Sequence, residues 1–157
     1  HAYIICVGDL VKATHLFDKH MPPEVPRVAL VDTFKDEVEE SVRVASAMRD
    51  KLRAVRLDTP VERGRVTPEL VHEVRAHLDM HGFKQVGIVV TGGLTPDRIC
   101  EFVDSGATID SFGVGSYVAG AAPNHFTGDI HEVDGKPIAK RGRIPGVTDN
   151  PRLTQVL

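Results

Sequence analysis

The chain has 157 residues, of which 41% are hydrophobic and 26% are charged, and its formal net charge at pH 7 is −3. It holds enough apolar side chains for one globular core, and its acidic balance argues against nucleic-acid binding, which usually leaves a basic footprint. No apolar run approaches the roughly 20 residues that cross a bilayer, so we expect no membrane partner.

Strand-like and helix-like patterns alternate from the start of the chain to about residue 120. Residues 2–19 favour a helix, because polar side chains recur from Asp9 onward. After them, short apolar runs bounded by turn residues predict strands, and the amphipathic segments between the runs predict helices. The predicted strands are 27–33, 54–59, 85–91 and 111–118, and the predicted helices are 36–52, 67–82 and 95–106.

The helix predicted over 36–52 has a clear apolar face and a charged start. Several acidic residues lie in its first turn, where the helix dipole favours negative charge. The expected core positions recur at helical spacing. They are Val38, Val42, Ala45, Met48 and Leu52, and the acidic residues are Asp36, Glu37, Glu39 and Glu40.

The spacing of the predicted strands indicates the fold class. They begin 26 to 31 residues apart, which is the length of one strand plus one helix. Strands joined by crossover helices form a parallel sheet, so we expect an α/β protein of repeated βα units over residues 1–120. Residues 121–157 differ: 131–138, with an Asp-Gly turn, predict a hairpin, and an extended tail follows from Gly142.

Charged side chains are predicted at the carboxyl ends of the first two strands, where parallel α/β sheets bind ligands. The first strand ends in Asp32-Thr33. Near the end of the second, Arg56 and Asp58 alternate with apolar residues and therefore point to the same face. An unpaired buried charge is costly, so this pair either contacts a ligand or forms a structural ion pair.

Glycines mark the ends of the next two strands. Without a Cβ atom, a loop can approach an anion closely and offer backbone N–H donors, so two such loops in succession favour a phosphate site. The alternative is that the loops are only tight turns. The residues concerned are Thr91, Gly92 and Gly93 after the third strand, and Gly113, Gly115 and Ser116 after the fourth.

The cysteines and two histidines complete the candidates. Cys6 and Cys100 are too few for a disulfide framework, and no basic-then-apolar leader opens the sequence, so we expect a cytoplasmic protein. Both cysteines lie in apolar helical segments and are expected in the core. His77 and His81 lie four positions apart, which fits a solvated helix face better than a metal site.

Several of these segments together resemble the nicotinate phosphoribosyltransferases, within the type II phosphoribosyltransferases. The resemblance covers about residues 1–143 and corresponds to the C-terminal part of the family's irregular TIM-like barrel; the N-terminal domain and the earlier barrel strands have no counterpart here. The matching segments are His1-Ala2-Tyr3, Leu30-Val31-Asp32-Thr33-Phe34, Val55-Arg56-Leu57-Asp58-Thr59-Pro60, Thr91-Gly92-Gly93-Leu94 and Asp110-Ser111-Phe112-Gly113-Val114-Gly115.

The resemblance implies transfer of a phosphoribosyl group from phosphoribosyl pyrophosphate to nicotinate, in NAD biosynthesis. Mg²⁺ would accompany the pyrophosphate, near Asp32 and Asp58 but without a firm ligand set, and ATP would be a coupled substrate. The partners implied are these small molecules, further copies of the chain in a homodimer or larger assembly, and the missing N-terminal portion. The implied catalytic residues are His1, Arg56 and Asp58; the substrate-binding residues are Asp32, Thr33, Arg56 and Asp58; the phosphate-binding residues are Thr91, Gly92, Gly93, Gly113, Gly115 and Ser116.

Other functions stay open at this point. Nicotinamide or quinolinate could replace nicotinate, with quinolinate ranked lower because its phosphoribosyltransferases do not need the histidine motif that His1-Ala2 resembles. The chain could instead be a non-catalytic fragment that binds phosphate or a nucleotide. A barrel enzyme of unrelated chemistry, sharing only the phosphate site, is the remaining alternative.

Overall fold

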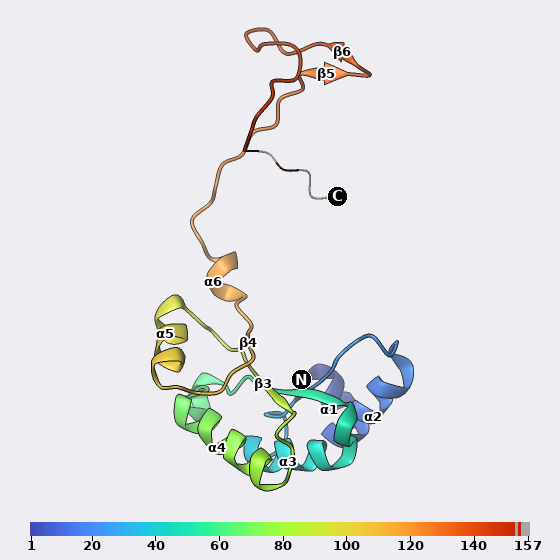
Figure 1. The fold of residues 1–157 in the computed structure, drawn as a ribbon, viewed down its shortest axis with the longest axis vertical. Coiled ribbons are helices and arrows are strands. Elements are labelled where there is room, and N and C mark those ends of the chain that lie inside the picture. The colour runs from blue at the N-terminus through green and yellow to red at the C-terminus, as the bar shows by residue number, and fades with distance from the viewer. Residues whose placement is uncertain (153, 155–157) are drawn as a thin grey trace. The chain divides into compact units, whose positions relative to one another are not determined.

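A parallel sheet organises the first part of the chain. In the computed structural model, which describes residues 1–152 and 154, the chain divides into two units, His1–Ala121 and Ala122–Leu157 (Figure 1). The sheet of the first unit has four strands, paired in the order β1-β2-β3-β4 and all parallel. The strands are β1 (Arg27–Leu30), β2 (Leu52–Leu57), β3 (Gly87–Val90) and β4 (Ser111–Phe112).

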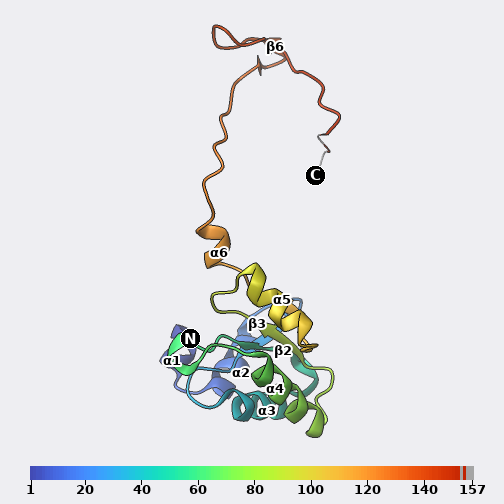
Figure 2. The same ribbon diagram turned by 90° about the vertical axis from the view of Figure 1, so that its left-hand side faces the viewer.

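Helices connect these strands and cover one face of the sheet. Each connecting helix has an N-cap side chain, Asp36, Thr67 or Thr95, that accepts a hydrogen bond from a backbone N–H of the first turn. Two of the helices, α3 and α4, pack side by side (Figure 2). The connecting helices are α3 (Glu37–Met48), α4 (Pro68–Met80) and α5 (Pro96–Asp104). The predicted α/β fold of repeated βα units is therefore confirmed.

The two faces of the sheet differ in burial. On the face toward the helices, Val55, Leu57, Ile88 and Val90 are fully buried. On the other face, neighbouring positions such as Arg56 remain partly exposed. The core thus lies between the sheet and the helices, and the open face carries the charged strand-end residues.

The opening segment forms two helices, although the sequence predicted one. They are α1 (Ala2–Val7) and α2 (Leu10–His20). Gly8 ends the first helix in the left-handed region at φ +84°, and Asp9 caps the second by accepting from the Lys12 N–H. The break therefore follows from a local stop signal next to a local start signal.

The boundaries of two predicted elements are also wrong. The fourth strand ends at Phe112, and after the loop of residues 113–115 the chain forms α6 (Ser116–Ala119). The helix predicted over 36–52 ends at Met48, and the 3-10 turn η1 (Arg49–Lys51) leads into β2. Its apolar face is also rotated from the expected one: Val38 and Val42 are only partly buried, whereas Glu37, Glu40 and Ser41 are buried.

Both cysteines are exposed, so their predicted place in the core is wrong. Each lies two residues from a buried side chain of its own helix, Cys6 after Ile4 and Cys100 before Phe102. Two residues correspond to about 200° around a helix, which places the two cysteines on the opposite side. Within the described residues, no helix is long and apolar enough to cross a membrane.

The second unit contains the predicted hairpin. β5 (Glu132–Val133) and β6 (Lys136–Pro137) pair antiparallel, and Asp134 and Gly135 turn the chain with φ of 49° and 74°. Two successive positive φ angles are typical of the tight turns that join hairpin strands. The tail follows without a helix or strand over residues 142–152, and 153 and 155–157 lie outside the described residues.

Candidate active site

Four of the predicted site residues meet at the carboxyl edge of the sheet. Asp32 follows β1, Arg56 lies in β2, Asp58 follows β2 directly, and His1 precedes α1. The Nε2 atom of His1 lies 3.4 Å from Oδ2 of Asp32 and 3.5 Å from Oδ2 of Asp58. A guanidinium nitrogen of Arg56 lies 3.6 Å from the same Asp58 oxygen. One imidazole and one guanidinium therefore face two carboxylates.

Strand pairing brings these residues together. Sheet pairing continues past the end of β1, because the Val31 N–H donates to the Arg56 carbonyl at 3.2 Å. This keeps Asp32 beside the end of β2. Thr33 also contributes, since its hydroxyl lies 3.0 Å from Nδ1 of His1. Both ring nitrogens of His1 are thus in contact with side chains of the site.

Asp32 is the most buried of the charged groups. Its side chain is 2% exposed, and its Oδ1 atom has no hydrogen-bond partner among the described residues. Burial raises the pKa of this carboxyl, helped by the negative charges of Asp58 and Glu37 and opposed by its own backbone N–H and Arg56, to about 6. Asp32 can therefore exchange a proton close to neutral pH.

The two carboxylates offer oxygen ligands for a cation. Mg²⁺ is commonly held by one or two carboxylates together with substrate phosphates. The unpartnered Oδ1 of Asp32 and the neighbouring Asp58 fit that mode. Within the described residues, no cluster of three or more His, Cys, Asp or Glu side chains is placed to hold a metal ion without ligands from a substrate.

The glycine loop after β3 lies against Asp58. Gly92 and Gly93 have φ of +96° and +63°, which glycine adopts without strain. A Cβ atom on Gly92 would lie only 3.0 Å from Oδ1 of Asp58. Thr91 anchors the loop, because its N–H and its hydroxyl both donate to the Leu57 carbonyl. Gly92 therefore permits a close approach between this loop and the carboxylate.

The loop after β4 joins this group only in part. A Cβ atom on Gly113 would lie 2.5 Å from the Thr91 methyl group, so the loops after β3 and β4 pack directly together. Gly115 has open space at its Cβ position among the described residues, and Ser116 begins α6. No hydrogen bond or ion pair in the described part of the chain joins these last two residues to His1, Asp32, Arg56 or Asp58.

A buried network behind these loops was not predicted from the sequence. Glu37, which begins α3, is 2% exposed in its side chain and accepts a hydrogen bond from the Thr59 hydroxyl at 2.8 Å. Arg63, in the 3-10 turn η2 (Val61–Arg63), lies 3.3 Å from the other oxygen of Glu37. One sign of the burial of Glu37 was visible in the sequence. Glu37 shares a helical stripe with Ser41, Val44 and Met48, and all four residues are buried.

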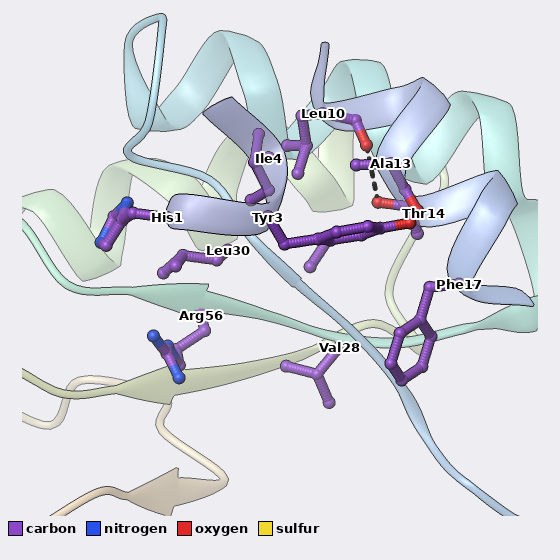
Figure 3. A pocket seen from close by; sticks show the side chains of 11 residues that line it. His1, Tyr3, Ile4, Leu10, Ala13, Thr14, Phe17, Val28, Leu30 and Arg56 are labelled. Carbon is purple, nitrogen blue, oxygen red and sulfur yellow. Dashed lines mark hydrogen bonds between the residues drawn. The ribbon is translucent and has the colours of Figure 1, made fainter. Parts of the chain in front are cut away.

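An apolar pocket adjoins His1 and Arg56 (Figure 3). It has a volume of about 290 Å³ and lies between the first two helices and β1. Tyr3, Phe17 and Leu30 are among its lining residues, and His1 and Arg56 lie together at one end (Figure 3). The pocket therefore combines apolar walls with a cationic end.

Comparison with known proteins identifies the family. A model of the family described as "Quinolinate phosphoribosyl transferase, C-terminal domain" matches residues 1–127. Two curated relatives, nicotinate phosphoribosyltransferase pncB2 from the CDC 1551 and H37Rv strains of Mycobacterium tuberculosis, are 31% identical over 118 residues, or 74% of this chain. The crystal structure of nicotinate-nucleotide pyrophosphorylase from Pyrococcus furiosus matches 94% of the chain with 51% identity and a TM-score of 0.74.

The chain spans 24% of the length of these curated relatives and 37% of the solved structure. The matches differ in the pyridine compound that they name: the family description contains quinolinate, the curated relatives' names contain nicotinate, and the solved structure is named for the nicotinate nucleotide. The matches therefore agree with the expected phosphoribosyltransferase family and support the two acids equally. The chain belongs to the family of quinolinate phosphoribosyl transferase C-terminal domains.

Proposed function

We propose that this chain forms part of the active site of a phosphoribosyltransferase that joins nicotinate to phosphoribosyl pyrophosphate in NAD biosynthesis. The observation that carries the proposal is the meeting of His1, Asp32, Arg56 and Asp58 at one edge of the sheet. Membership of the family supports the class of reaction. Nicotinate is preferred because His1, which ends the histidine motif of the resemblance, contacts both carboxylates.

In this proposal the carboxylates act on the charges that develop during transfer. The bond from the ribose C1 to pyrophosphate breaks, and the pyridine nitrogen supplies the electron pair for the new bond. Positive charge develops on the sugar, where Asp58 would stabilise it. Mg²⁺, held by Asp58 and the free Oδ1 of Asp32, would neutralise negative charge on the leaving pyrophosphate.

Arg56 would bind the carboxylate of the pyridine acid. A guanidinium pairs with a carboxylate through two parallel hydrogen bonds. Arg56 lies at the end of the apolar pocket, whose walls suit an aromatic ring, and this favours the pyridine acid over pyrophosphate as its partner.

The glycine loops would hold the 5′-phosphate of the ribose. Gly92 and Gly93 lead into α5, whose N-terminus favours an anion. Thr91 and Gly113 pack the two loops together, so their backbone donors would face one phosphate group. Gly115 and Ser116 would complete this site from the loop after β4.

His1 would couple the reaction to ATP. Its imidazole lies between Thr33 and the two carboxylates, so a phosphoryl group on its ring would add negative charge beside Asp32 and Asp58. The expected result is that ATP raises the rate of the unchanged protein, and that His1→Asn removes this stimulation. We further propose a cytoplasmic homodimer or larger assembly, on the strength of the resemblance.

Quinolinate is the second candidate substrate, because the family description names it. The complete protein, incubated with phosphoribosyl pyrophosphate, Mg²⁺ and nicotinate, nicotinamide or quinolinate in turn, distinguishes the candidates by the mass of the mononucleotide formed. We expect the highest kcat/KM with nicotinate. Product from quinolinate alone, with release of CO₂, would support the second candidate. Calorimetric binding of nicotinate mononucleotide without any turnover would support the non-catalytic alternative.

A further inference from the structure

Glu37 joins the two loops that carry the carboxylates of the candidate site. It lies at the start of α3, directly after the loop that contains Asp32. Its buried carboxylate accepts the hydrogen bond from Thr59, the residue that follows Asp58. The loop after β1 is thereby tied to the loop after β2 by a hydrogen bond that is shielded from water.

Two features beside Glu37 attract a negative charge. The first turn of a helix favours a negative charge, and the Arg63 guanidinium lies 3.3 Å away. A charged acceptor forms a stronger hydrogen bond than a neutral one. Thr59 is itself only 5% exposed, so water does not compete for its hydroxyl. We therefore expect the hydrogen bond between Glu37 and Thr59 to persist in the folded protein.

A second buried glutamate on the same helix, Glu40, has partners that lie away from the candidate site. Glu40 is as buried as Glu37, at 1% exposure each. It pairs with Arg43 at 2.9 Å, and Arg43 in turn pairs with Asp9, the N-cap of α2. The contacts of Glu40 therefore lead to the joint between α2 and α3, whereas those of Glu37 lead to the site.

We propose that Glu37 is a positioning residue, which through Thr59 holds the Asp58 carboxylate in the place relative to Asp32 that phosphoribosyl transfer requires. The inference rests on the proposed function and adds to it a group that touches no substrate. Misplacement of a reacting group by about 1 Å can lower a rate by roughly 100-fold. Loss of the Glu37–Thr59 bond should therefore appear in kcat.

The test is the steady-state kinetics of the complete protein and its variants. Glu37→Gln removes the charge, Thr59→Val removes the donor while keeping the shape, and Thr59→Ser keeps the donor. We expect Glu37→Gln and Thr59→Val to lower kcat by roughly 10- to 100-fold. The KM values for both substrates should change by less than about threefold, because neither residue contacts substrate. Thr59→Ser should stay within about threefold of the unchanged protein in kcat.

The matched control is Glu40→Gln, which alters an equally buried carboxylate of α3 and should leave kcat within about threefold. The double variant Glu37→Gln/Thr59→Val should lose no more than the worse single variant, since both remove one contact. Additive losses, an equal effect of Glu40→Gln, or equal effects of Thr59→Ser and Thr59→Val would overturn the proposal. If Glu37→Gln does not fold, the comparison of Thr59→Ser with Thr59→Val still tests the proposal. If the protein without any substitution forms no mononucleotide, the proposed function is wrong. That result differs from a failure of the Glu37 proposal alone, in which the protein without substitutions is active.

Discussion

Asp32 combines near-complete burial, an unpartnered oxygen and a pKa of about 6 against an ordinary value of 3.8. The folded state binds the proton more tightly than the unfolded state, so ionisation of Asp32 opposes folding. This unfavourable contribution is absent well below pH 3.8, develops between pH 3.8 and about 6, and is complete above that range. Its full size is about 2–3 kcal/mol.

Asp32→Asn should therefore stabilise the protein at pH 7.5, by up to about 2–3 kcal/mol, and have little effect at pH 4. Urea unfolding at both pH values, in buffer without magnesium, measures the difference. Asp50→Asn, at an exposed position in η1, is the control and should change stability at neither pH. An equal gain at both pH values, or a loss at pH 7.5, would contradict the account of Asp32.

A substitution of Arg56 tests which substrate binds in the apolar pocket. Lysine retains the positive charge but cannot form two parallel hydrogen bonds with a carboxylate. We expect Arg56→Lys to raise the KM for nicotinate about tenfold, which corresponds to the loss of one charge-assisted bond, and to leave the KM for phosphoribosyl pyrophosphate nearly unchanged. If the KM for phosphoribosyl pyrophosphate rises instead, Arg56 binds the pyrophosphate.

At the scale of the elements, the glycine loop after β3 determines how closely the backbone approaches Asp58. Gly92→Ala places a methyl group 3.0 Å from the Asp58 carboxylate, at a φ of +96°. Gly82→Ala imposes a similar φ of +84°, with nothing within 4 Å among the described residues. Both should lower stability by about 1 kcal/mol, but only Gly92→Ala should lower kcat/KM, by roughly tenfold or more. Equal activity of the two variants would refute the role given to this loop.

The strand ends show which features can be predicted from local patterns. Arg56 and Asp58 lie on one face because side chains alternate along a strand, and the alternation is visible in the sequence. The caps of α4 and α5 follow from Thr-Pro pairs in the same way. Such features depend on neighbours in the chain, and the prediction of parallel βα units is confirmed for that reason.

Some contacts between residues far apart in the chain were not predicted. The core positions expected in the helix over 36–52 were right for Ala45, Met48 and Leu52, which are buried, and wrong for Val38 and Val42. The burial of the charged Glu37 and Glu40 was not predicted. Their partners lie on other elements: Thr59 and Arg63 for Glu37, and Asp9 through Arg43 for Glu40. The place of Gly92 against Asp58 likewise requires β2 and β3 to be paired. Local propensity contains no information on such contacts.

At the scale of the whole molecule, the sheet that carries the candidate site has an edge at β1. The carboxylates lie on the open face of the sheet, and β1 is the first strand in the sheet order. An edge strand exposes backbone groups that pair with a further strand. Val28 on β1 is 42% exposed, although it is apolar. The chain spans 37% of the solved relative's length, and we propose that catalysis requires a longer protein that contains these residues.

The proposed function depends most on the carboxylate of Asp58, which we propose takes part in phosphoribosyl transfer. The most direct measurement is formation of nicotinate mononucleotide by the complete protein and by Asp58→Asn, with Asp50→Asn as a control at an exposed position. We expect full activity for the control and a loss of at least about 100-fold for Asp58→Asn, because a positioned charge opposite the developing positive charge is removed. An Asp58→Asn protein that folds normally and retains the activity of the unchanged protein would contradict this role of Asp58.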